Sequence, residues 1–107
     1  MKIISIHNAA ESMTGTSVEF SEVLRFPAMS AGVYHLPRRA DDPQDPHMDD
    51  EVYYVLSGRG KLESGGETAE IGPGDLIHVP AHEPHKFVEI EQALTLLVVF
   101  APAERGG

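Results

Sequence analysis

The sequence predicts an all-β fold for this chain. Short runs of β-type residues recur between turn signals along most of its length, and no segment shows a convincing helical period. Clusters rich in glycine, proline and serine separate the apolar runs. The pattern indicates a β-sandwich or a β-barrel. Nine candidate strands are expected, at residues 2–7, 18–26, 32–36, 52–56, 60–63, 68–71, 76–79, 86–90 and 94–100.

Glycine-containing segments mark the expected chain reversals. Residues 57–60 and 64–67 lie between apolar runs and are predicted to be hairpin turns, because glycine reaches the positive φ angles that such turns require. Residues 72–75 indicate a third reversal. Residues 13–22 are the least regular stretch, and residues 103–107 are expected to be a frayed tail.

Length and composition narrow the classes of protein. A chain of 107 residues fits one domain with a single core, and its 41% hydrophobic and 23% charged residues are typical of a soluble globular protein. Neither a long apolar span nor a leader-like N-terminus is visible, so a cytoplasmic location is expected. The net charge of -9 disfavours nucleic acid and anionic membranes as partners. Because cysteine is absent, any bound metal has to be held by nitrogen and oxygen atoms.

A dense group of acidic residues precedes the fourth candidate strand. Asp41 and Asp42 begin it, beside prolines, and are interpreted as part of a solvated loop. Glu51 differs from them, because it opens an apolar strand.

Residues that can bind a metal lie next to predicted strands at two separate places in the sequence. His47 and Glu51 lie four positions apart before a strand, and His85 follows a later strand and a proline-rich turn. Two imidazoles and a carboxylate form a mixed nitrogen and oxygen site, which suits Mn, Fe, Co, Ni or Zn. The three residues are therefore candidate ligands, provided that the fold brings them together.

The same two segments carry a resemblance to a known family. His47-x3-Glu51-x6-Gly58 is similar to the latter part of the first cupin motif, and Gly74-x5-Pro80-x4-His85 is similar to the second. From about residue 31 to residue 100 the chain resembles a single-domain cupin. The resemblance implies a jelly-roll barrel (a double-stranded β-helix) within one domain of residues 1–107. Strands from residues 2–26 would pack on this barrel, and residues 101–107 would form a tail.

The resemblance also implies one divalent transition metal, namely Mn, Fe, Ni, Co, Cu or Zn, bound near the mouth of the barrel. His47, Glu51 and His85 occupy three of the family's ligand positions. The family's first histidine is replaced by Asp45, next to Gln44. Either of these residues could supply a fourth, oxygen ligand, or the site keeps three protein ligands and more water.

Strand alternation predicts the walls of a pocket around such a site. If Glu51 points inward, Tyr53 and Val55 share its face, and if His85 points inward, Phe87 shares its face. Tyr53 either packs in the core or donates a proton or hydrogen bond to a substrate.

Three further histidines receive separate interpretations. His78 is expected in the core or the pocket wall because it lies in an apolar run, and His35 is interpreted in the same way. His82, which stands where the second motif usually has glycine, is expected to be exposed in a turn. Glu89 departs from the motif too, because asparagine is usual at that position.

The function that this pattern favours is a metal-dependent reaction on a small oxygenated organic molecule, held in the barrel pocket. Dioxygenase, isomerase, decarboxylase and lyase activities all remain open, since one fold hosts many reactions. A cupin that binds or senses a small ligand without catalysis is the alternative. A homodimer is also expected, and the apolar run 94–100 is a candidate for either burial or a subunit contact.

Overall fold

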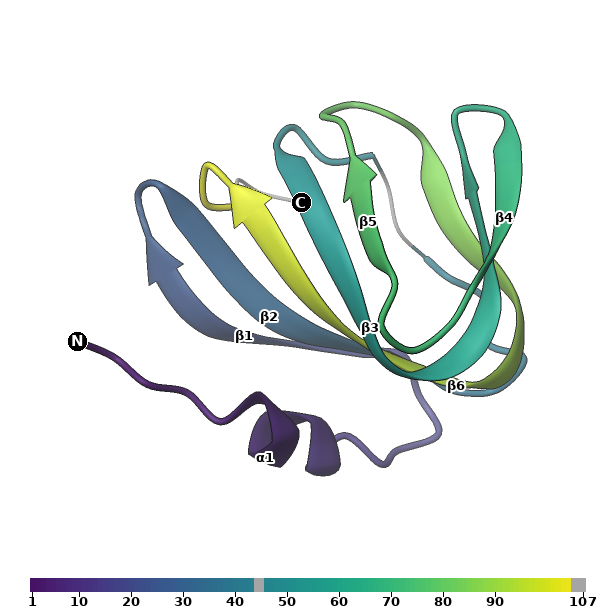
Figure 1. Cartoon of the computed structure of the whole chain (residues 1–107), viewed down its shortest axis with the longest axis horizontal. Coiled ribbons are helices and arrows are strands. Elements are labelled where there is room, and N and C mark those ends of the chain that lie inside the picture. The colour runs from purple at the N-terminus through teal and green to yellow at the C-terminus, as the bar shows by residue number, and fades with distance from the viewer. Residues whose placement is uncertain (44–45, 105–107) are drawn as a thin grey trace.

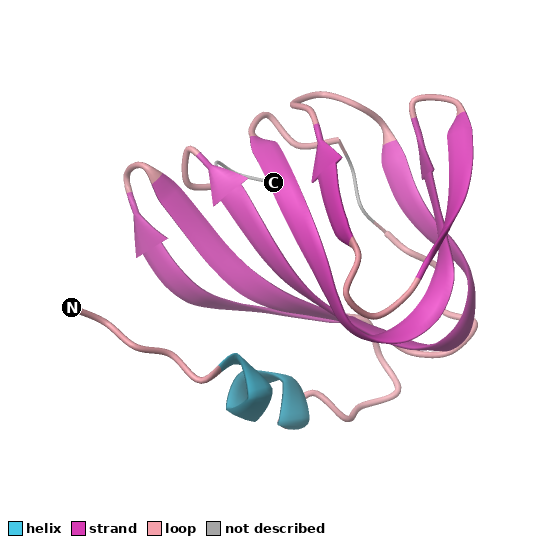
Figure 2. Ribbon diagram, viewed as in Figure 1, coloured by secondary structure: helices cyan, strands magenta, loops and turns pink. Residues whose placement is uncertain are grey.

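Antiparallel strands account for most of the regular structure (Figure 2), which confirms the all-β prediction. The computed structural model describes residues 1–43 and 46–104. No helix in these ranges is long and apolar enough to cross a membrane. The elements are α1 (Ile6–Glu11), β1 (Glu19–Phe26), β2 (Met29–Leu36), β3 (Asp50–Ser64), β4 (Glu67–Ile71), β5 (Leu76–Val79) and β6 (His85–Ala101).

The two longest strands, β3 and β6, organise the sheet. The strand order is β1-β2-β6-β3-β4, and β5 pairs with β3 at Glu51–Tyr54, away from the part of β3 that pairs with β4. Figure 1 shows β3 and β6 bending strongly, so that the sheet rolls around a common interior between the β1 side and the β4 side. One curved sheet therefore supplies both walls of the barrel.

The bend in β3 lies where the sequence predicts a hairpin turn. Residues 57–60 do not reverse the chain, because β3 continues through them and its register with β6 shifts at three points between Val55 and Lys61. Gly58 has a φ of +96°, and a Cβ atom there would meet the carbonyl oxygen of Ala93 at 2.1 Å. This glycine marks a bulge and a close approach of two backbones. The prediction of two separate strands at 52–56 and 60–63 is therefore wrong.

The other strand predictions have mixed outcomes. Residues 76–79 match β5 to the residue, and a turn at 64–67 does connect β3 with β4. The candidates 86–90 and 94–100 merge into the single strand β6, because they bend through a bulge at Glu89, whose φ is +47°, without reversing.

A helix replaces the first predicted strand. Residues 2–5 have no regular structure, and α1 begins after Ser5, whose side-chain oxygen accepts a hydrogen bond from the backbone N–H of Asn8 at 3.3 Å. Ser5 is thus the N-cap of α1. A six-residue helix is too short to show a helical period in the sequence, but its N-cap residue is still a recognisable signal. Of residues 2–26, only β1 adds a strand to the sheet, by pairing with β2.

Apolar side chains fill the barrel interior. On β3 the buried Tyr53 and Val55 alternate with the exposed Tyr54, as expected for period two. The cluster also draws residues from β2, β4, β5 and β6, so it is shared by both walls. Its members are Tyr34, Leu36, Tyr53, Val55, Leu62, Ile71, Val79, Phe87, Ile90, Leu94, Leu96, Val98 and Phe100.

The loop before β3 is anchored to this core through Asp42. The side chain of Asp42 accepts a hydrogen bond from the Tyr34 hydroxyl at 2.6 Å and another from the backbone N–H of Phe87 at 2.9 Å. Asp42 is 4% exposed. The interpretation of Asp42 as a solvated loop residue is therefore wrong, because two buried donors stabilise its carboxylate inside the protein. Burial and this carboxylate raise the pKa of Tyr34 well above its usual range.

Candidate metal centre

Three candidate ligands from distant parts of the chain meet inside the barrel. Glu51 is the second residue of β3, His85 is the first residue of β6, and His47 lies on the loop before β3. One possible ligand atom from each lies within 4.8 Å of the others. The three residues therefore form a group that could hold a metal ion.

The curvature of β3 makes this meeting possible. His85 pairs with Ser64, the last residue of β3, whereas Glu51 lies near the first. A straight strand would separate two such residues by roughly 40 Å, yet His85 Nε2 lies 2.6 Å from Glu51 Oε1. The bulges around Gly58 thus bring the two ends of β3 across the interior from one another.

The orientation of His85 is fixed by its second nitrogen. Nδ1 lies 2.9 Å from the carbonyl oxygen of Glu83. A carbonyl oxygen only accepts, so Nδ1 carries the hydrogen and donates it. Nε2 therefore faces the Glu51 carboxylate, either as a protonated nitrogen or with a lone pair that is available to a metal.

Glu51 is the one carboxylate among these three residues. The residue is 1% exposed, and its Oε2 accepts no hydrogen bond from residues 1–43 or 46–104. Its Oε1 is the partner of His85. A buried carboxylate oxygen without a donor is energetically costly, and a bound cation would remove that cost. The residues present therefore fit a divalent metal.

The protonation of His85 is linked to the same pair. Burial alone would lower its pKa, but the contacts with Glu51 and with the Glu83 carbonyl outweigh burial and raise the pKa above its usual value. The raised pKa favours a proton on His85 in metal-free protein, where Nε2 faces the Glu51 carboxylate. Binding of a metal at Nε2 requires that this proton leaves.

Tyr53 lies beside His85, and Phe87 packs on Tyr53. The Tyr53 hydroxyl is 3.1 Å from His85 Nε2, and the Tyr53 ring packs edge to face on Phe87 at a centroid distance of 5.0 Å. Tyr53, Val55 and Phe87 are fully buried, each at 0% exposure. This burial agrees with the prediction that these side chains of β3 and β6 point into the barrel.

His47 is held by contacts that the sequence pattern does not reveal. Its ring lies 5.0 Å from that of Phe100, and His47 Nδ1 lies 3.3 Å from Glu104 Oε2. The backbone of Glu104 is also bound: its N–H donates to Ser30 Oγ at 2.9 Å, and its carbonyl accepts from Arg25 Nη2 at 2.9 Å. Burial raises the pKa of Glu104. Residues 103–104 are therefore docked on the sheet, contrary to the expectation of a frayed tail.

The remaining predicted positions lie elsewhere. His78 is exposed, because on β5 it alternates with the buried Val79, so its assignment to the core or pocket wall is wrong. His35 is buried as expected and lies 3.1 Å from Thr95 Oγ1. His82 is exposed, and its backbone N–H donates to the His47 carbonyl at 2.7 Å. Gln44 and Asp45 lie outside the described residues.

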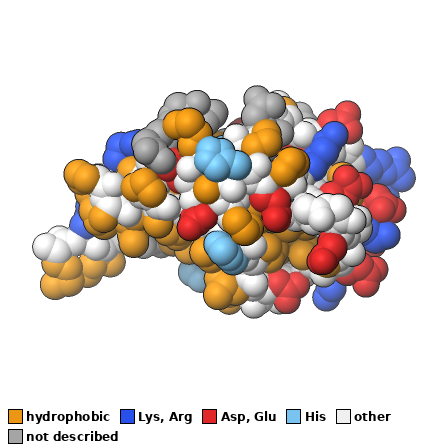
Figure 3. Space-filling view, turned by 90° about the horizontal axis from the view of Figure 1, so that it is seen from above, with side chains coloured by type: hydrophobic (Ala, Val, Ile, Leu, Met, Phe, Trp, Pro, Cys, Tyr) orange, Lys and Arg blue, Asp and Glu red, His pale blue; other side chains and the backbone are white. Residues whose placement is uncertain are grey.

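One cavity borders His85, but neither Glu51 nor His47 lines it. It has a volume of about 420 Å³ and is bordered by His85, Lys86, Pro46 and the turn between β3 and β4. Seen from above, histidine side chains lie among hydrophobic and acidic ones, while charges of both signs gather at the β4 end (Figure 3).

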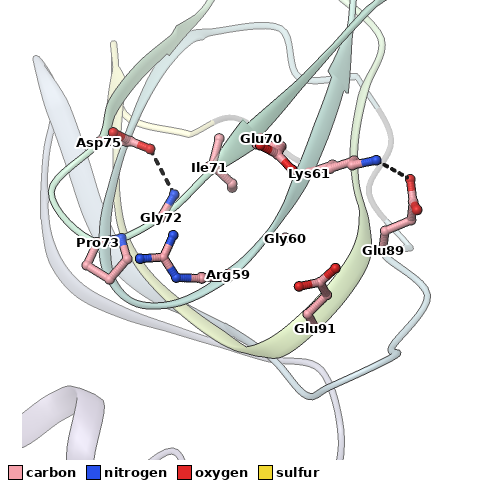
Figure 4. A pocket seen from close by; sticks show the side chains of 10 residues that line it. All are labelled: Arg59, Gly60, Lys61, Glu70, Ile71, Gly72, Pro73, Asp75, Glu89 and Glu91. Atoms are coloured by element: carbon pink, nitrogen blue, oxygen red, sulfur yellow. Dashed lines mark hydrogen bonds and ion pairs between the residues drawn. The ribbon is translucent and has the colours of Figure 1, made fainter.

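A second cavity, of about 270 Å³, contains none of the three candidate ligands. Figure 4 shows Arg59 and Lys61 there, together with carboxylates that line the same cavity, namely Glu70, Asp75, Glu89 and Glu91. Lys61 Nζ pairs with Glu89 Oε2 at 3.2 Å, so part of this charge is already compensated. Of these two cavities, only the first is bordered by a candidate ligand, which is His85.

Known proteins are similar to this chain in sequence and in fold. An uncharacterised protein of Streptomyces coelicolor is 38% identical over 104 residues, which cover 97% of this chain and 99% of that protein. The crystal structure of TT1209 from Thermus thermophilus aligns with 28% identity and a TM-score of 0.82, over 96% of this chain and 99% of that one.

A likeness to a characterised enzyme concerns the fold alone. The DMSP lyase DddQ from Ruegeria pomeroyi has 21% identity and a TM-score of 0.74, over 78% of this chain and 46% of that one. Residues 32–100 match the sequence model of the Cupin domain family, Cupin_2. The resemblance found in the two motifs is therefore confirmed, and the chain belongs to the cupin family.

Proposed function

We propose that His47, Glu51 and His85 bind one divalent transition metal ion, and that the protein acts on a small oxygenated organic molecule at this ion. The observation that carries the proposal is the buried Oε2 of Glu51, which accepts no hydrogen bond from the described residues. Two imidazoles and one carboxylate are suitable ligands for Mn, Fe, Co, Ni, Cu or Zn.

Each residue has a distinct part in this proposal. His85 offers Nε2, since Nδ1 is engaged by the Glu83 carbonyl. Glu51 supplies the negative charge that a divalent ion requires. A bound metal would act as a Lewis acid on a carbonyl, enediol or carboxylate oxygen. The Tyr53 hydroxyl, 3.1 Å from His85 Nε2, is positioned to donate a hydrogen bond at the edge of this site.

The cavity beside His85 supports a small substrate. Its volume of about 420 Å³ falls in the range of small-molecule sites. Its border carries the cation of Lys86 and the carboxylates of Glu63 and Glu67, so a ligand there would meet charges of both signs. Dioxygenase, isomerase, decarboxylase and lyase reactions are all compatible with this arrangement.

Binding without catalysis is the second candidate function. The observation that favours it is the burial of Tyr53: its ring is 0% exposed and packs on Phe87. A hydroxyl held in this way is well placed to fix the position of His85 and poorly placed to exchange protons with solvent. A ligand-binding cupin needs no such exchange.

Metal titration tests the proposal. We expect protein purified without chelators to bind about one equivalent of Co²⁺ or Zn²⁺ by calorimetry, and His85→Ala to weaken that binding at least a hundredfold, because a ligand is lost. His78→Ala is the matched control, since it removes an exposed histidine outside the cluster. Wild-type protein that binds no stoichiometric metal would contradict the proposal.

A substrate panel distinguishes the two candidate functions. Turnover of a small oxygenated compound that disappears in His85→Ala supports an enzyme, whereas saturable binding of the unchanged compound supports a sensor or carrier. The homodimer and the cytoplasmic location expected from the sequence stay predictions, and light scattering tests the first of them.

A further inference from the structure

We infer that Glu104 is a positioning residue for the metal ligand His47. Its carboxylate lies beside Nδ1 of the imidazole. In the metal-bound protein it accepts a hydrogen bond from Nδ1, so that Nε2 is the nitrogen directed at the metal. The inference rests on the proposed metal site and adds to it a residue from the chain's C-terminal segment, outside both cupin motifs.

The backbone of Glu104 is fixed on both sides of the side chain. Its N–H donates to Ser30 Oγ at 2.9 Å, and Ser30 is 2% exposed on β2. Its carbonyl accepts from Arg25 Nη2 at 2.9 Å. Just before it, the N–H of Ala103 donates to the Pro27 carbonyl at 3.4 Å. The segment after β6 is therefore bound to the β1–β2 hairpin. This fixes the backbone from which the Glu104 carboxylate extends.

The Glu104 side chain lies in a more protected place than ordinary surface carboxylates. In the ion pair of His47 with Glu104, the side chains are 12% and 22% exposed. In the Arg25–Glu22 pair they are 50% and 39% exposed, and in the Lys61–Glu89 pair 36% and 66%. Surface pairs of the latter kind contribute little, whereas a shielded carboxylate can orient an imidazole.

Each histidine of the cluster has an oxygen near Nδ1, but the two contacts differ in geometry. His85 gives Nδ1 to an oxygen acceptor, the Glu83 carbonyl, and turns Nε2 toward Glu51. His47 Nδ1 lies 3.3 Å from a Glu104 oxygen, an ion-pair contact that falls short of hydrogen-bond geometry among the described residues. A negatively charged acceptor on Nδ1 fixes the tautomer and makes Nε2 a stronger donor to a metal.

The test compares Co²⁺ affinity and histidine spectra in side-chain variants. Glu104→Ala is expected to weaken Co²⁺ binding by about tenfold to a hundredfold, the usual effect of losing a partner behind a metal-bound histidine. Glu104→Gln keeps an oxygen acceptor without the charge and is expected to restore part of the loss. In Zn²⁺-loaded wild-type protein, ¹⁵N spectra are expected to show His47 protonated at Nδ1.

Glu22→Ala is the matched control. It removes the same charge from a carboxylate that pairs with Arg25 and not with a candidate ligand. We expect its Co²⁺ affinity to stay within about twofold of wild type. An equal loss in Glu22→Ala and Glu104→Ala would overturn the inference, because the effect would then be one of general charge.

The outcomes separate the inference from the proposed function. If wild-type protein binds Co²⁺ and Glu104→Ala binds it equally well, or if Zn²⁺ is bound to Nδ1 of His47, the role of Glu104 is refuted and the metal site stands. If wild-type protein binds no stoichiometric Co²⁺, both are refuted.

Discussion

Two buried carboxylates, nine positions apart in sequence, occupy opposite kinds of environment. Asp42, in the loop that leads to β3, accepts hydrogen bonds from the Tyr34 hydroxyl and from the Phe87 N–H. Glu51, at the start of β3, has a histidine at Oε1 and no donor from the described residues at Oε2. Both are almost inaccessible, at 4% and 1% exposure.

The difference shows that burial alone does not mark a functional carboxylate. Asp42 has donors for its charge within the fold, so it stabilises the native state without needing a ligand. Glu51 lacks such a complement among the described residues, and a proton on His85 or a bound cation would supply one. The hydrogen-bond donors that reach each buried carboxylate therefore distinguish a structural carboxylate from a candidate metal ligand.

The largest expected effect is that of Glu51→Gln on metal binding. Removal of the charged ligand should raise the dissociation constant for Co²⁺ about a thousandfold, or roughly 4 kcal/mol. Calorimetry measures this loss directly. In thermal unfolding, saturating Co²⁺ should raise the melting temperature of wild-type protein and leave that of Glu51→Gln unchanged. Equal metal stabilisation of both proteins would remove the distinction between the two carboxylates.

Asp42→Asn should have a smaller effect, and on a different quantity. The amide keeps one acceptor oxygen where the carboxylate has two, so a buried donor loses its partner and the free energy of unfolding falls by about 2 kcal/mol. Urea denaturation of metal-free protein measures the change. Tyr34→Phe is the control, because it removes the hydroxyl that donates to Asp42 and keeps the Asp42 carboxylate. Folded Asp42→Asn should still bind metal, and loss of metal binding with unchanged stability would reverse the roles assigned here.

The sequence reveals the site better than its surroundings. Glu51, Tyr53 and Val55 share a buried face because strand alternation is a local rule, and it needs no knowledge of the fold. His47 and His85 are identified by motif spacing. Their approach to Glu51 depends on how far β3 bends, and Gly58, the residue at that bend, carries the same sequence signal as a hairpin turn.

Other contacts have no local signal. Asp42 sits among acidic residues and prolines, as solvated residues do, and its donors come from residues 34 and 87. Glu104 follows the last strand and meets His47 from the far end of the chain. His78 lies in an apolar run, yet the pairing of β5 with β3 leaves it exposed. In each case tertiary contacts, which composition and period do not encode, decide the environment.

The smallest expected effect is a pH dependence that follows from the His85–Glu51 pair. Burial lowers the pKa of His85, but Glu51 and the Glu83 carbonyl raise it further, so the net pKa lies above the usual value. In metal-free protein the pair therefore contributes stability that is fully present below about pH 6.5, the usual histidine pKa, and is lost as pH rises through the raised one.

Metal affinity should change in the opposite direction over the same window. A metal at Nε2 competes with the proton there, so Co²⁺ binding strengthens as pH rises, until His85 is neutral in the free protein. Urea denaturation and calorimetry from about pH 6 to pH 9 follow the two quantities. Glu51→Gln removes a main cause of the raised pKa, so the metal-free variant should lose the decline in stability. Parallel stability curves for wild type and Glu51→Gln would mean that no imidazolium–carboxylate pair forms, and that Asp42 and Glu51 differ in hydrogen bonding alone.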